Sequence, residues 1–137
     1  MREQENIKDT SSKEIPMTND KGDKPFDLED RTFEFARRVR LLIKRLPDTV
    51  ANREDIPQLV RASGSVGANY REANDALGKK DFSMRLKISR KESKESRYWL
   101  RLLDIGADEA LATERDRLVE EATELVKIFS SILQKCA

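Results

Sequence analysis

The stretch Ser63-Gly64-Ser65-Val66-Gly67-Ala68-Asn69-Tyr70-Arg71-Glu72-Ala73 decides the fold. Its apolar and small residues recur with helical spacing, yet a glycine inside a helix costs about 0.5–1 kcal/mol relative to alanine. Two glycines in one helix therefore need a compensating gain, and close approach of the next helix along the chain would supply it. That neighbour also carries small residues on its inner face: Ser89, Ser93 and Ser96. The alternative is that the small residues leave a groove for a ligand.

Working outward, four segments place residues that are nearly all apolar or small at alternating steps of three and four, which is typical of helices packed in bundles. The first is Leu28, Thr32, Phe35, Val39, Leu42 and Leu46. The second is Ile56, Leu59, Ser63, Val66, Tyr70, Ala73 and Leu77. The third is Phe82, Leu86, Ser89, Ser93, Ser96, Leu100 and Leu103. The fourth is Leu111, Arg115, Leu118, Ala122, Leu125, Phe129 and Ile132.

Three residues are expected to mark helix starts. Asp27 can cap the first helix, and Asp81 or a neighbour can cap the third, because a carboxylate accepts from backbone N–H groups that lack a helical partner. Pro57 suits the first turn of the second helix. The connections are short, which favours an up-down-up-down order. The sequence thus predicts an all-α fold, an antiparallel four-helix bundle over residues 26–137.

The N-terminal segment differs in composition from the rest of the chain. Residues 1–25 hold too few apolar side chains to offset the entropy of ordering, so we expect a disordered polar tail. No run of apolar residues is long enough for a membrane span, and the segment lacks the apolar centre of a signal peptide. With a single cysteine, Cys136, the chain cannot form an internal disulfide. We expect a cytoplasmic protein.

Histidine, the commonest general base and transition-metal ligand, is absent from the chain. Glu92 and Glu95 are the nearest approach to a catalytic pair, and they could hold a hard cation or share a proton. Charges beside an apolar face need partners, so we favour bonds from these carboxylates to Arg85, Asn69, Arg71 or a neighbouring subunit. We therefore expect no enzymatic activity, no metal and no cofactor.

The third helix carries the strongest charge signal. The whole chain has a net charge of only +1, but residues 79–101 have a net charge of +6. Five of these cations recur at steps of three and four and define the basic ridge: Lys87, Arg90, Lys94, Arg97 and Arg101. Such a ridge with Tyr98 alongside suits a nucleic-acid backbone. The alternative is that the ridge faces the fourth helix of the same or another subunit, because residues 108–135 have a net charge of −3.

The quoted stretch, together with Asp81-Phe82 and the run from Lys91-Glu92 to Tyr98-Trp99-Leu100, resembles the bacterial "four helix bundle protein" family. This family includes proteins encoded in intervening sequences of large-subunit ribosomal RNA genes and relatives of diversity-generating retroelement accessory proteins. The resemblance covers about residues 26–135. It implies a homopentamer and, for the retroelement branch, binding of nucleic acid or a reverse transcriptase. The family signature falls mainly on residues expected to serve packing and assembly: Asn69, Glu72, Glu92, Glu95 and Trp99.

The apolar faces of the first and fourth helices are wider than one bundle core requires. Val119, Val126 and Leu133 form a second stripe on the fourth helix, and we expect them to contact a neighbouring subunit. The leading hypothesis is therefore an oligomeric protein that binds RNA, DNA or a nucleoprotein through the basic ridge. A protein–protein adaptor, whose cations serve subunit contacts, is the second hypothesis.

Overall fold

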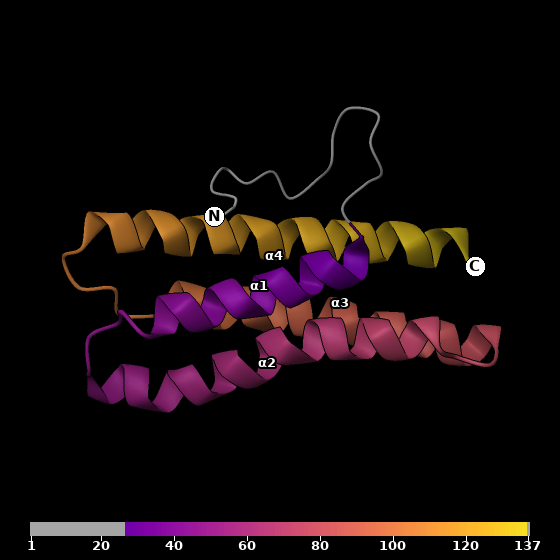
Figure 1. The fold of residues 1–137 in the computed structure, drawn as a ribbon, viewed down its shortest axis with the longest axis horizontal. Helices are drawn as coiled ribbons and strands as arrows, with labels where there is room; N and C mark the ends of the chain where they lie inside the picture. Colours follow the sequence, from indigo (N-terminus) through magenta and orange to yellow (C-terminus); the bar gives the residue numbers. More distant parts are fainter. Residues whose placement is uncertain (1–26, 137) are drawn as a thin grey trace. The chain divides into compact units, whose positions relative to one another are not determined.

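The computed structural model describes residues 27–136, which form four α-helices (Figure 1). These are α1 (Leu28–Ile43), α2 (Val50–Asn74), α3 (Lys79–Leu102) and α4 (Glu109–Lys135). Consecutive helices run in opposite directions, α2 packs on α3, and α3 packs on α4. The predicted all-α, up-down-up-down bundle is confirmed. The prediction of a disordered tail at residues 1–25 concerns residues outside the described range.

The described chain divides after Arg31 into two compact units. In the first unit, the Asp27 carboxylate accepts from the Glu29 N–H at 3.0 Å, so the predicted cap of α1 is confirmed. The remaining residues form the second unit, and within residues 27–136 no helix is long and apolar enough to cross a membrane.

Pro57 does not lie in the first turn of α2, and Asp81 is not the N-cap of α3. A side-chain cap at Thr49, whose hydroxyl accepts from the Asn52 N–H at 3.1 Å, starts α2 well before Pro57. Pro57 lies inside the helix on its exposed face, where water can serve the Arg53 carbonyl that loses its partner. The N-cap of α3 is Gly78, which leaves Asp81 in the first turn, where its charge favours the helix dipole.

The predicted seams supply most of the core. Its largest fully buried side chains are Phe35, Phe129, Leu42, Leu59, Leu86, Leu100, Leu111, Leu118, Leu125, Val39 and Val66. Leu77 is the main error, because α2 ends at Asn74 and the Leu77 side chain is fully exposed in the following turn. The heptad repeat therefore predicts the core well inside each helix and fails where a helix stops.

The small residues of α3 pack close to α2 as predicted, whereas the glycines of α2 face a different helix than predicted. The Ser89 hydroxyl of α3 donates to the Val66 carbonyl of α2 at 2.9 Å, as close approach of these helices requires. The glycines instead face α1. A Cβ on Gly67 would lie 2.8 Å from Oγ1 of Thr32, and a Cβ on Gly64 would lie 3.2 Å from a guanidinium nitrogen of Arg40.

One buried amide joins two loops at the same end of the second unit. Nδ2 of Asn52 donates to the carbonyls of Pro47 and Asp104, both at 2.9 Å. Its Oδ1 accepts from the Asp104 N–H, also at 2.9 Å. The α1–α2 and α3–α4 connections are thereby held to the first turn of α2.

Candidate nucleic-acid interface

The basic ridge runs along α3, but its five cations occupy two different environments. Three of them have exposed side chains that make no hydrogen bond or ion pair with any residue between 27 and 136: Lys87, Lys94 and Arg101. They are seven residues apart, so about 10.5 Å of helix separates each from the next. These three cations are therefore available to bind an anion from outside the chain.

Arg90 and Arg97 contribute to packing instead. A guanidinium nitrogen of Arg90 donates to the Ser130 hydroxyl of α4 at 3.3 Å, and one of Arg97 donates to the Thr123 hydroxyl at 3.1 Å. Both arginines are half-buried. The sequence placed them on the same surface as the lysines, whereas the structure places them at the α3–α4 border. Because hydroxyls are neutral, their positive charges still add to the field of the ridge.

The outward face of α3 includes two residues that the ridge omits. Lys91 and Tyr98 lie between the exposed ridge cations and complete a row of exposed residues, here called the outer stripe: Lys87, Lys91, Lys94, Tyr98 and Arg101. Nζ of Lys91 is 3.9 Å from the Glu92 carboxylate, and its side chain is 70% exposed. An ion pair this long and solvated contributes little, so Lys91 remains available to a ligand.

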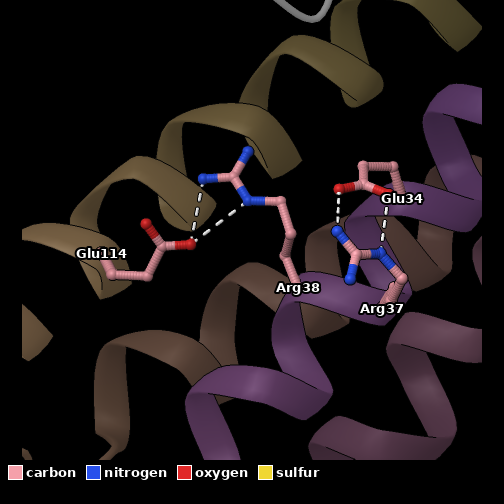
Figure 2. Close-up of polar contacts among 4 residues, drawn as sticks. All are labelled: Glu34, Arg37, Arg38 and Glu114. Carbon is pink, nitrogen blue, oxygen red and sulfur yellow. Dashed lines mark hydrogen bonds and ion pairs between the residues drawn. The ribbon is translucent and has the colours of Figure 1, made fainter. Parts of the chain in front are cut away.

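Two cations of α1, Arg37 and Arg38, contrast with those of α3, because they have acidic partners in the same chain (Figure 2). Arg38 on α1 donates to the Glu114 carboxylate on α4 at 3.0 Å. Arg37 makes two bonds to Glu34, at 2.9 and 2.6 Å. These hydrogen bonds to Glu34, together with the negative charge of Glu34, raise the pKa of Arg37 above its ordinary value, although partial burial lowers it. These two cations of α1 therefore serve the bundle more than an external ligand.

The family-signature residues form local contacts near the packed faces of α2 and α3. Arg85 of α3 donates to Oδ1 of Asn69 at 3.0 Å, and Nδ2 of Asn69 donates to the Ser65 carbonyl at 3.0 Å. Asn69 thus joins α2 to α3. One of the expected partners of Glu92 and Glu95, Arg85, bonds to Asn69 instead of to these carboxylates. Glu72 is exposed in the last turns of α2.

Glu92 and Glu95 have separate surroundings. Oε1 of Glu95 accepts from the Trp99 indole N–H at 3.2 Å, and Glu92 lies near Lys91. Among the described residues, no group of three or more acidic or cysteine side chains is arranged to hold a metal ion. Val119, Val126 and Leu133, the predicted subunit contact, are each half-buried within the single chain.

Comparison with known proteins identifies the family of this chain. The model of the 23S rRNA-intervening sequence protein family matches residues 25–131. The chain belongs to this family. A solved structure from Bacteroides thetaiotaomicron, described as a protein of unknown function from the S23 ribosomal protein family, is similar, with 32% identity and a TM-score of 0.64. The similarity covers 78% of this chain and 98% of that one. No curated protein matches the chain.

The 23S rRNA-intervening sequence protein match includes all of α3 and therefore the whole basic ridge and outer stripe. It begins next to the predicted boundary at residue 26 and ends within α4. The predicted family is confirmed over nearly the range the sequence motifs indicated.

Proposed function

We propose that this member of the 23S rRNA-intervening sequence protein family is a cytoplasmic, non-enzymatic, oligomeric bundle protein that binds nucleic acid or a nucleoprotein through the basic ridge. The exposed cations of α3 carry the proposal. Lys87, Lys94 and Arg101 have no acidic partner within residues 27–136, although α4 packs directly against their helix. An intramolecular role would pair these cations with α4, as Arg38 pairs with Glu114.

The spacing of these cations suits a polyphosphate chain. From Lys87 to Arg101 the helix rises about 21 Å, which corresponds to about six phosphates on one strand of B-form DNA. One subunit can therefore make about three or four phosphate contacts. For single strands, this number predicts a slope of about −2 to −3 for log affinity against log salt. Several ridges in one oligomer would steepen the slope.

A charge-reversal triple variant tests this proposal. Lys87→Glu/Lys94→Glu/Arg101→Glu should abolish salt-dependent binding to mixed RNA and DNA probes while helicity is retained, because these side chains bond nothing else in the described chain. Reversal of Arg90 or Arg97 is less suitable, since it would also break contacts with α4. Binding is measured by fluorescence anisotropy over a salt series with nuclease-treated protein.

The matched control changes the same net charge elsewhere. Lys44→Glu/Arg61→Glu/Arg71→Glu alters three exposed cations, one just after α1 and two on α2, whose side chains also have no partner within residues 27–136. This variant should lose only the small part of the affinity that depends on overall charge. Equal losses in the two triple variants, or unchanged binding in the ridge variant, would contradict the proposal.

An adaptor function is the second candidate, and the acidic surface of α4 favours it. Glu120 is exposed and bonds nothing within the described chain, while the exposed Asp116 and Glu124 pair only with neighbours on their own helix. The α4 of another subunit or partner could therefore receive the ridge. In that case the ridge variant dissociates the oligomer in native mass spectrometry, and the wild type binds no probe even at low salt.

A further inference from the structure

The last turns of the outer stripe combine an exposed aromatic ring with flanking cations. Resting on the proposed function, we infer that this surface selects single-stranded nucleic acid: an unpaired base stacks on Tyr98, while Lys94 and Arg101 hold phosphates on either side. The three residues are separated by four and three positions, so they lie on one face of α3. The inferred ligand is thus a phosphate chain with accessible bases, either RNA or DNA.

Tyr98 has the exposure that such a role needs. The residue is 55% exposed, whereas the other tyrosine of the chain, Tyr70, is half-buried with its ring 6.0 Å from that of Phe129. A base can therefore stack its flat apolar face on the exposed ring, while the neighbouring cations bind the phosphates. Stacking of this kind tolerates every base, because each has a π face.

Contact with the neighbouring indole restricts the orientation of the Tyr98 phenol. The Tyr98 and Trp99 rings meet edge to face, with centroids 5.0 Å apart and an interplanar angle of 82°. The indole is in turn held by its bond to Glu95. Since the two rings do not stack on each other, at least one face of the phenol is free of Trp99. A preorganised ring loses less entropy when a base binds.

The charges around the ring also favour a base over a second phosphate. Three cations and one anion lie within one turn of Tyr98: Lys94, Arg97, Arg101 and Glu95. The Glu95 carboxylate lies on the Trp99 side, where it accepts from the indole N–H. Phosphates are attracted to the cations and repelled from the carboxylate. A strand along the cations therefore directs its bases toward the aromatic pair. In a duplex the bases are stacked within the helix, and extruding one costs a few kcal/mol.

Trp99, the single tryptophan of the chain, provides a direct readout. A short oligouridylate and a short oligothymidylate should both quench its fluorescence, because the stacked base lies beside the indole. An abasic oligomer of the same length and charge should bind more weakly and leave the fluorescence nearly unchanged. This comparison uses the wild-type protein, so it does not depend on any variant folding.

Two substitutions test the ring itself. Tyr98→Leu should lower affinity for the oligonucleotides by about 5- to 150-fold and leave affinity for the abasic oligomer within about twofold. Tyr98→Phe, which keeps the ring, should behave as wild type, and circular dichroism confirms that both variants are folded. If the abasic oligomer or a duplex binds as tightly as the single strands, the base-stacking inference is overturned and phosphate binding by the ridge survives. If no probe binds in a salt-dependent way, the proposed function itself fails.

Discussion

At the scale of single residues, the two glycines of the opening stretch differ in what they accommodate. Gly67 lies against the side chain and backbone of Thr32, which is buried on α1. Gly64 lies only against a guanidinium nitrogen at the end of the long Arg40 side chain. That nitrogen donates to the Val60 carbonyl at 3.3 Å, but the side chain is exposed, so a small shift can exchange this long bond for one to water. The same residue type in the same helix therefore meets a rigid neighbour at one position and a flexible neighbour at the other.

Alanine substitutions should separate these two cases. Gly67→Ala is expected to lower the free energy of unfolding by about 1–2 kcal/mol through overpacking, although alanine is the better helix former. Gly64→Ala, the matched control, should leave stability unchanged or raise it by up to about 1 kcal/mol. Urea unfolding followed by circular dichroism measures both. Equal effects would show that neither glycine is required by contact with α1.

The Asn52 amide acts at the scale of elements, because it holds two loops to the start of α2. Asn52→Ala removes three hydrogen bonds and is expected to lower the free energy of unfolding by about 2–3 kcal/mol, at about 1 kcal/mol per bond. Gln58→Ala, at an exposed position of the same helix, should change it by less than about 0.5 kcal/mol. A loss below about 1 kcal/mol for Asn52→Ala would mean that water replaces these bonds.

The helices themselves were predictable, because a buried stripe at steps of three and four identifies the core face without knowledge of the neighbours. The residues at which the helices start were harder to predict. The Thr49 cap competed successfully with Pro57 as the start of α2, and Gly78 begins α3 with no side-chain bond. The bonds of Asn52 join positions distant in sequence and leave no periodic signal.

The candidate interface was predictable only in part, for a geometric reason. The ridge and the outer stripe share Lys87, Lys94 and Arg101, and both follow steps of three and four along α3. In the ridge, Arg90 and Arg97 lie between the shared cations. In the outer stripe, Lys91 and Tyr98 lie there instead. That choice depends on which flank of α3 contacts α4, and sequence periodicity carries no information on it.

At the scale of the whole molecule, the predicted subunit contact borders the proposed binding surface. Val119, Val126 and Leu133 alternate along α4 with Thr123 and Ser130, the hydroxyl partners of Arg97 and Arg90. A subunit docked on this stripe would lie beside the ridge. Since the net charge is only +1, binding must depend on how charge is distributed, and assembly would bring several ridges into reach of one strand.

Leu133→Asp tests this coupling of assembly and binding. The side chain is half-buried in the single chain, so a carboxylate there should break the subunit contact and yield monomers that remain helical. Light scattering after size exclusion measures the mass, and circular dichroism measures the helicity. Leu41→Asp, at an exposed leucine of α1, is the matched control and should leave the mass unchanged.

Because each monomer offers one ridge, the Leu133→Asp variant should also bind a long single strand at least tenfold more weakly, with a shallower salt slope. Affinity for a strand short enough to contact one ridge should be unchanged. An unfolded variant would instead place Leu133 in the monomer core, and an oligomer of unchanged mass would place the subunit contact elsewhere. Equal loss on short and long strands would mean that the ridge requires the neighbouring subunit to form its site.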